Sequence, residues 1–334
     1  MNISFRRIST YLLLPLVAAL LSSASCDSRL SKQETSQPVN VVFNADSAYY
    51  FCQKQCSFGE RTMNSRAHDL CGEWIADKFR SYGMNVSLQQ TVVKGYDGTP
   101  LNVTNIIAEY KPELAERLLL CAHWDTRPWA DNDPDTVNWH NPIMGANDGA
   151  SGVGVLLETA RLLASSDSVR VGVDFVCFDA EDWGFPEWEW GRMPDPGDTW
   201  ALGSQYWADN NSGKHYRFGI LLDMVGGIGS TFYQEGMSCQ YAQHIVDKVW
   251  SAASTAGYLS FFPPQTGAYV TDDHVYINEK AGIPTIDIIP FFPDCPSSTF
   301  GPTWHTVDDT MDNIDCKILE AVGQTIVQVV FSEP

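Results

Sequence analysis

Short apolar runs alternate along most of the chain with longer segments that have helical spacing of apolar residues. The apolar runs predict strands at residues 104–110, 118–122, 171–179, 218–224 and 285–289. The periodic segments predict helices at residues 64–82, 149–164, 201–210, 242–256, 275–281 and 315–331. In the first of these helices, Leu70, Trp74 and Phe79 are expected near one face, and Gly83 ends it. Strands that alternate with helices predict an α/β fold with a central, mostly parallel (mixed) sheet flanked by helices on both faces.

Polar residues follow the predicted strands at the points where these strands end. Ligands of open parallel sheets bind outside the carboxyl ends of the strands, so these residues are expected to form one site. A single acid at such a position is more often a solvated loop residue or a helix cap than part of a site. The prediction of a site therefore rests on the recurrence of polar residues at successive strand ends. The set consists of His123, Asp125, Asp148, Glu181, Asp182, Asp223, Asp272, Asp273, His274 and His305.

Two carboxylates and one imidazole in this set match the ligands that zinc prefers in catalytic sites, where one coordination position stays open. Asp148, Asp182 and His305 are the predicted metal ligands. Glu181 stands next to a ligand without being one, so it is free to act as a general acid and base.

The acidic composition limits the kinds of partner. The formal net charge is −20 and 44% of the residues are hydrophobic. A phosphate backbone would be repelled, so no nucleic-acid partner is expected, whereas the free amine of a peptide N-terminus would be attracted. Solubility alone is the simpler explanation of the charge. The length suits one large catalytic α/β domain, predicted at residues 41–334.

The N-terminus has the pattern of an export signal. Arg6 and Arg7 precede an apolar stretch at 11–21 that is too short for a comfortable membrane span. We expect a signal peptide at 1–25 and a polar tether at 26–40. Cys26 after small residues indicates a bacterial lipoprotein, exported to the periplasm and held on the membrane only by a lipid anchor. Simple cleavage without acylation is the alternative.

Nine cysteines are present. Cys121 and Cys177 lie inside predicted strands and are expected to be small buried hydrophobic residues. Cys52, Cys56 and Cys71 are close in sequence, so one disulfide among them is allowed in an exported protein. The absence of a Cys-x-x-Cys pair argues against a cysteine-ligated zinc site.

The order of these motifs resembles that of the zinc aminopeptidase superfamily over roughly residues 100–330. The matching elements are His123-x-Asp125, Asp148 in Asn-Asp-Gly-Ala-Ser-Gly, Glu181-Asp182, Asp223, the Asp-His pair at 273–274 and His305-Thr306. Three details resemble its glutaminyl cyclase branch: Asp272 where aminopeptidases usually have serine, Trp304 before the last histidine, and the run 303–309. Asp182 replaces the glutamate of animal cyclases, and Asp287 stands where those enzymes have histidine.

The resemblance implies a zinc aminopeptidase-like fold with one zinc per chain and a defined reaction. N-terminal glutamine of peptides and proteins would be cyclised to pyroglutamate, with release of ammonia. Zinc would polarise the γ-amide carbonyl, and Glu181 would move the proton from the α-amine to the departing ammonia. Asp223 and Asp272 would share a proton. Trp304 would form a wall of the substrate pocket, and Trp183 or Trp188 a second aromatic surface, although core packing is the simpler role for each tryptophan.

Two other functions remain open from the sequence. His123, Asp148 and Asp223 could bind a second metal, as in a two-zinc aminopeptidase. A non-catalytic binding protein on a peptidase fold is the other alternative, but such proteins lose ligands or the base, and none is lost here. In a one-zinc cyclase His123 would not be a ligand. Asp125, Arg127 and Asp131 would either order the surrounding loop or be solvated.

Overall fold

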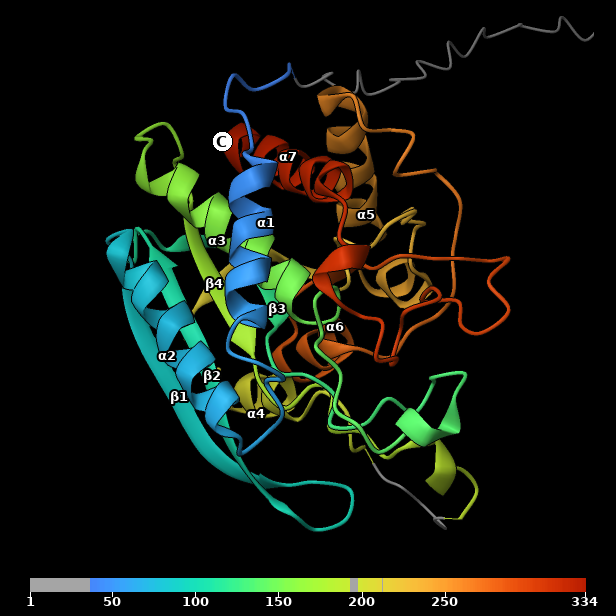
Figure 1. Ribbon diagram of the computed structural model, residues 1–334. Coiled ribbons are helices and arrows are strands. Elements are labelled where there is room, and N and C mark those ends of the chain that lie inside the picture. The colour runs from blue at the N-terminus through green and yellow to red at the C-terminus, as the bar shows by residue number, and fades with distance from the viewer. Residues whose placement is uncertain (1–36, 193–197, 212) are drawn as a thin grey trace, which may run out of the picture. The chain divides into compact units, whose positions relative to one another are not determined.

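Six strands form one mixed sheet in the order β1-β2-β4-β3-β5-β6. This is seen in a computed structural model that describes residues 37–192, 198–211 and 213–334 (Figure 1). The strands β4, β3, β5 and β6 run parallel to one another, while β1 and β2 pair antiparallel at one edge. The strands are β1 (Asn85–Lys94), β2 (Pro100–Tyr110), β3 (Glu116–His123), β4 (Gly172–Phe178), β5 (His215–Leu222) and β6 (Thr285–Ile288).

Helices cover both faces of the sheet because side chains of the central strands alternate between two cores. Leu118, Leu120 and Ala122 of β3 point into the larger core, and Leu119 and Cys121 into the smaller one. The larger core is covered by α1 (Ala45–Cys56), α2 (Arg66–Ser81), α3 (Ala150–Ala164), α5 (Gly236–Ala256) and α7 (Cys316–Ser332). The smaller core is covered by α4 (Leu202–Asn210) and the π-helical turn η3 (Ile277–Ala281), which continues α6 (Asp273–Tyr276).

The predicted fold class is confirmed, and the differences lie mainly in the N-terminal third. The helix α1 and the strand β1 were missed. The strand β1 is an edge strand in which Leu88 is 42% and Val92 62% exposed, so its alternation does not separate a buried face from a solvated one. Leu70 was wrongly placed on the buried face of α2. It is 40% exposed, and the buried side is formed by Cys71, Ile75 and Phe79.

The helix α5 begins six residues earlier than the predicted start at Ala242. Glu235 caps it by accepting hydrogen bonds from the backbone N–H of Met237 and Ser238. Ala242 has non-helical dihedral angles (φ −146°, ψ 46°), so the helix is interrupted where the prediction began.

The described chain begins within the predicted tether. Gln328 of α7 accepts a hydrogen bond from the N–H of Val39 and donates one to the carbonyl of Gln37. The predicted signal peptide and Cys26 lie outside the described residues. Within the part of the chain that is described, no helix has the length and hydrophobicity needed to cross a membrane.

All cysteines in the described residues are free thiols, so the disulfide considered for Cys52, Cys56 and Cys71 is not formed. The thiol of Cys52 instead donates to the carbonyl of Ala150 at 3.5 Å. Burial raises the pKa of Cys71 to about 12, which keeps this thiol protonated. Cys121 and Cys177 are fully buried, as predicted.

Candidate active site

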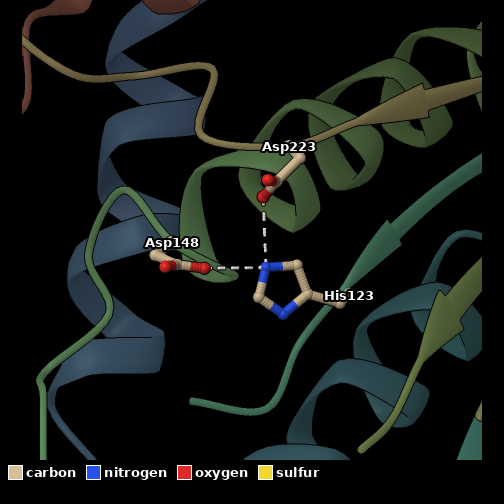
Figure 2. Close-up of side chains that lie close together, drawn as sticks. All are labelled: His123, Asp148 and Asp223. Carbon is tan, nitrogen blue, oxygen red and sulfur yellow. Dashed lines mark hydrogen bonds and ion pairs between the residues drawn. The ribbon is translucent and has the colours of Figure 1, made fainter. Parts of the chain in front are cut away.

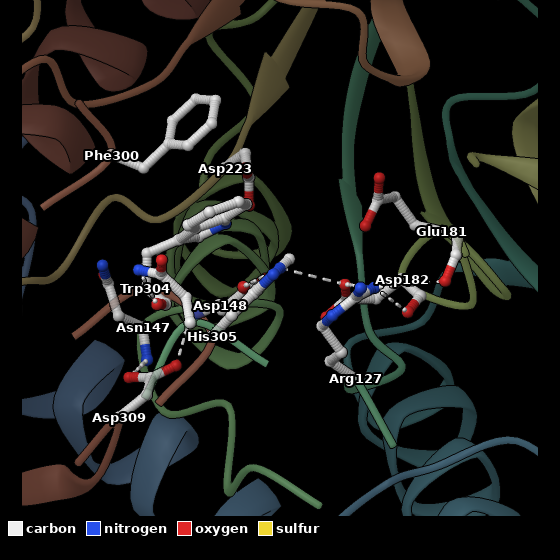
Figure 3. A network of polar contacts seen from close by, with 12 residues as sticks. Arg127, Asn147, Asp148, Glu181, Asp182, Asp223, Phe300, Trp304, His305 and Asp309 are labelled. Atoms are coloured by element: carbon white, nitrogen blue, oxygen red, sulfur yellow. Dashed lines mark hydrogen bonds and ion pairs between the residues drawn. The ribbon is translucent and has the colours of Figure 1, made fainter. Parts of the chain in front are cut away.

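The parallel strands bring the predicted site residues to one edge of the sheet. His123 is the last residue of β3, Glu181 and Asp182 follow β4, and Asp223 follows β5. Because β4, β3 and β5 are neighbours with their carboxyl ends together, side chains far apart in sequence meet there. Asp148 reaches the same edge from the turn before α3, and His305 from the long loop after β6. Figure 3 shows Asp148, Asp182 and His305 together with Glu181 and Asp223 at this edge.

The three predicted ligands form a buried cluster with donor atoms within 4.8 Å of one another. The Nε2 atom of His305 lies 3.3 Å from Oδ1 of Asp182 and 3.7 Å from Oδ2 of Asp148. Both carboxylate oxygens of Asp182 are buried without a hydrogen-bond partner among the described residues. Burial, followed by the charge of Asp148, raises the pKa of Asp182 to about 6. Two carboxylates and one imidazole are an N/O donor set that fits zinc.

Glu181 lies beside this cluster and is held through its backbone. The carboxylate of Asp125, which is fully buried, accepts hydrogen bonds from the N–H groups of Glu181 and Asp182 at 3.1 and 3.2 Å. The side chain of Glu181 points toward His123, with Oε2 at 3.9 Å from Nδ1. Burial raises the pKa of Glu181 well above its ordinary value, and the charge of Asp182 adds to that effect. A carboxyl group with a raised pKa suits general acid–base chemistry near neutral pH.

A second donor group shares Asp148. Figure 2 shows the Nε2 atom of His123 between two carboxylates, at 3.0 Å from Asp148 and 3.1 Å from Asp223. The three donor atoms lie within 4.8 Å of one another. Burial raises the pKa of Asp223 to about 7, although the hydrogen bond with His123 opposes this. The ligands considered for a second metal are therefore also brought together.

Asp272 and Asp223 line the same cavity, but each has a different principal partner. Asp223 pairs with His123, whereas Asp272 lies beside Asp287 and His274, with ligand atoms of the three within 4.8 Å. Burial raises the pKa of Asp287 well above its ordinary value, with the charge of Asp272 as the next cause. Oδ2 of Asp272 and both carboxylate oxygens of Asp287 are buried without a hydrogen-bond partner among the described residues. Asp272 is also the N-cap of α6, because it accepts from the N–H of Asp273.

A cavity of about 520 Å³ opens above these groups. Trp304 lies on its wall and stacks on the imidazole of His305, with ring centroids 3.7 Å apart. Trp183 and Trp188, predicted as a second aromatic surface, are not among its lining residues. They pack with Trp129 in a separate aromatic cluster, with ring centroids at 5.3 and 6.0 Å. The aromatic residues that line the cavity besides Trp304 are Trp190, Trp200, Tyr269, Tyr276 and Phe300.

Several residues of this edge have left-handed backbone conformations that non-glycine residues seldom adopt. Ala180, Met224 and His305 have φ angles of 52°, 50° and 53°. Ala180 precedes Glu181, Met224 follows Asp223, and His305 is itself in the donor cluster. Such conformations persist where the surrounding structure fixes them, and they concentrate at functional sites.

Residues 105–330 match peptidase family M28. The chain belongs to this family. The M28 assignment confirms the resemblance predicted from the sequence, and two solved structures agree with the cyclase branch. Glutaminyl cyclase of Bacteroides thetaiotaomicron, solved bound to N-acetylhistamine, is 49% identical, with 88% of this chain and 99% of that chain covered and a TM-score of 0.84. Glutaminyl cyclase of Tannerella forsythia is 46% identical, with 88% and 100% covered and a TM-score of 0.84.

Curated M28-like relatives are more distant. Aminopeptidase YwaD of Bacillus subtilis (strain 168) is 28% identical over 236 residues, which are 68% of this chain and 44% of that protein. The chain spans about half the length of the curated relatives that it matches, 44% and 56% for the first two.

Three features of this M28 site were missed or left open by the sequence. Asp309 accepts hydrogen bonds from the N–H groups of Asn147 and Asp148, and so fixes the turn that carries a predicted ligand (Figure 3). In the sequence, the position of Asp309 in the run 303–309 was the only feature that pointed to a role at the site. Trp200 follows a proline-rich segment and carried no distinguishing pattern. Arg127 and Asp131, left open between loop ordering and solvation, are 1% and 2% exposed and therefore belong to the buried framework.

Proposed function

We propose that this protein is a zinc-dependent glutaminyl-peptide cyclotransferase, an acyltransferase that converts the N-terminal glutamine of peptides and proteins to pyroglutamate and releases ammonia. The observation that carries the proposal is the position of Asp272. This acid, which stands where aminopeptidases usually have serine, lies on the wall of the cavity that also exposes Glu181 and the donor cluster. The two bacterial glutaminyl cyclases described above support the same reaction.

The donor cluster fits the zinc that this reaction needs. Asp148, Asp182 and His305 would hold the ion, and the two unpartnered, buried oxygens of Asp182 are the observation that favours a cation there. When bound, zinc would polarise the carbonyl of the γ-amide of the substrate. One zinc per chain is the proposed stoichiometry.

Glu181 would transfer the proton of the reaction. It accepts a proton from the α-amine of the substrate as the amine nitrogen bonds to the γ-amide carbon. The bond from that carbon to the amide nitrogen then breaks, and Glu181 returns the proton so that the nitrogen leaves as ammonia. Holding amine and amide together in one bent side chain supplies the proximity that the ring closure requires.

Asp272, with Asp287 behind it, would orient the reacting groups. Two carboxyl groups in a buried pocket do not both ionise at low cost, so one holds a proton near neutral pH. A proton shared with Asp287 would leave Asp272 able to accept a hydrogen bond from the substrate in the cavity. Trp304 would form the wall against which the glutamine side chain lies, since it lines the cavity and covers His305.

A two-zinc aminopeptidase is the second candidate, and one observation favours it. His123, Asp148 and Asp223 bring three donor atoms within 4.8 Å, which would serve a second ion bridged by Asp148. Metal stoichiometry and the released product separate the two functions.

The proposed setting is the periplasm, with export directed by residues 1–25 and a lipid anchor on Cys26. The proposed partners are peptides and proteins with N-terminal glutamine. Nucleic acids are not expected partners, because the net charge of −20 repels phosphate.

We predict that purified protein retains about one tightly bound zinc per chain. Removing the metal with a chelator should abolish ammonia release from a glutaminyl peptide, and adding zinc should restore it, because the ligands remain in place. Metal analysis alongside a coupled ammonia assay measures both quantities. Two zinc ions, both needed for turnover of an aminopeptidase substrate, would instead support the second candidate.

Glu181→Gln should keep zinc and lose about 10²–10⁴-fold in kcat, because the amide cannot carry the proton. Glu158→Gln is the matched control, since Glu158 is also buried but pairs with Arg161 away from the site. Zinc content and steady-state kinetics of both variants decide the matter. Normal turnover by Glu181→Gln would rule out its role as the acid–base group.

Asp272→Ala should retain zinc but lose cyclase activity by orders of magnitude, whereas Asp272→Asn should be milder because its amide still forms hydrogen bonds. The loss of the α6 cap should cost about 1 kcal/mol in Asp272→Ala, whereas asparagine caps a helix about as well as aspartate. Asp315→Ala removes the equivalent cap of α7, where Asp315 accepts from Lys317, and should lower stability with normal turnover. If Asp272→Ala behaves like Asp315→Ala in Tm and kcat/KM, Asp272 is only a cap.

Cys26→Ser should move the protein from the membrane fraction to the released fraction of its host, because acylation at this residue supplies the proposed anchor. More than one acyl chain is needed for stable anchoring, so the difference should be large. Cys295→Ser, a change at a free cysteine in the described chain, serves as control. Identical fractionation of both variants would argue for cleavage without a lipid anchor.

A further inference from the structure

Arg127 is a buried cation at the edge of the sheet that the proposed reaction does not use. Its Nε and Nη2 atoms donate to the two carboxylate oxygens of Asp131 at 2.7 and 2.6 Å. Its guanidinium group lies over the ring of Trp200, 4.6 Å from the ring centroid. A guanidinium group is suited to such a place, because it offers five donors in a rigid plane and stacks on aromatic rings.

The same guanidinium group reaches the predicted ligand Asp182. Nη1 donates to the carbonyl oxygen of Asp182 at 3.2 Å and lies 3.5 Å from Oδ1 of its carboxylate. Further contacts with the carbonyls of Gly184 and Phe185 hold the loop after β4. The carboxylate of Asp182 has no hydrogen-bond partner among the described residues, and its charged neighbours are Arg127 at 3.5 Å and His305 at 3.3 Å. Arg127 also binds the backbone of Asp182, so it holds this residue from two sides.

Asp131 contacts the second predicted ligand, His305. One of its oxygens lies 3.4 Å from Nδ1 of His305, and the other accepts from the N–H of Glu187 at 2.9 Å. A carboxylate that faces Nδ1 favours the tautomer with the proton there and leaves Nε2, the atom that faces Asp148 and Asp182, free to bind a metal.

We propose that Arg127 and Asp131 act as one positioning unit that couples Asp182 and His305 and sets the affinity of the site for zinc. This inference rests on the proposed function only in requiring that the donor cluster binds a metal. Neither residue touches substrate in the proposal. The two ligands come from loops more than a hundred positions apart in sequence, and this unit contacts both of them.

A matched pair of residues allows the effect on the metal to be separated from the effect on stability. Arg117 is also buried, at 3% exposure, and also binds a buried aspartate, with its Nε 2.9 Å from Oδ1 of Asp174. That pair lies at the opposite end of β3 and β4, away from the donor cluster. Arg117→Met therefore removes the same kind of interaction without touching a ligand.

The test measures the zinc Kd of the full chain by competition with a chelator, and the visible spectrum after replacement of zinc by cobalt. Arg127→Met and Asp131→Asn should each weaken zinc binding by about 10–100-fold and change the cobalt spectrum. Arg127→Lys, which keeps the charge but loses the planar fork, should give an intermediate Kd. Arg117→Met should lower Tm and leave both metal readouts unchanged. Asp131→Asn changes the side-chain volume little, so it provides a folded variant if Arg127→Met does not fold.

Two outcomes would overturn the inference while the proposed function stands. One is a wild-type zinc Kd in both Arg127→Met and Asp131→Asn. The other is equal weakening by Arg117→Met, which would trace the effect to general loss of stability. Wild-type protein that binds no zinc at all would overturn the proposed metal site together with this inference.

Discussion

Mutual repulsion among buried carboxyl groups is the constraint on which this site depends. Asp148, Glu181, Asp182, Asp223, Asp272, Asp273 and Asp287 gather at one edge of the sheet, and all but Glu181 are less than a tenth exposed. Taking an isolated carboxylate out of water is costly, so such groups persist only if they are protonated, hydrogen-bonded or paired with cations. Each of these three solutions is used in a different part of the site.

The solutions are distributed in a way that separates chemical roles. Burial alone would raise the pKa of Asp148. The hydrogen bond with His123 and the nearby positive charges outweigh burial and hold this pKa below its ordinary value. Burial raises the pKa of Glu181, Asp273 and Asp287 well above the ordinary value. Asp182 retains two unpartnered oxygens beside Arg127 and His305. Carboxyl groups with lowered and with raised pKa values thus arise from one crowded set of acids, because their environments differ.

The sequence predicted the parts of this arrangement that depend on periodicity and on strand ends. Buried parallel strands have continuous apolar runs, so the acids that follow β3, β4 and β5 were placed at a common edge without knowledge of the fold. Trp200 and the pairing of Asp272 with Asp287 were beyond reach, because they depend on how loops pack across the edge. Trp183 or Trp188 was predicted to form a second aromatic surface of the pocket, but both rings pack against Trp129 instead. The helix α1 was missed, although Ala48, Phe51 and Cys52 form its buried side and its packing against α3 and α7 stabilises it.

The contact between the two ends of the described chain has a consequence for the order in which the molecule assembles. Gln328 in α7 is hydrogen-bonded to Gln37 and Val39, and Gln324 to Phe43, so the first described residues complete their interactions only with the last helix. His305 and Asp309 also come from the final tenth of the chain, yet one belongs to the donor cluster and the other secures the turn of Asp148. A ribosome-bound fragment lacking that final tenth has neither a closed core nor a complete set of donors. Closure of the core and completion of the donor cluster both need these last described residues, and the large sequence separation of these contacts is a source of slow folding.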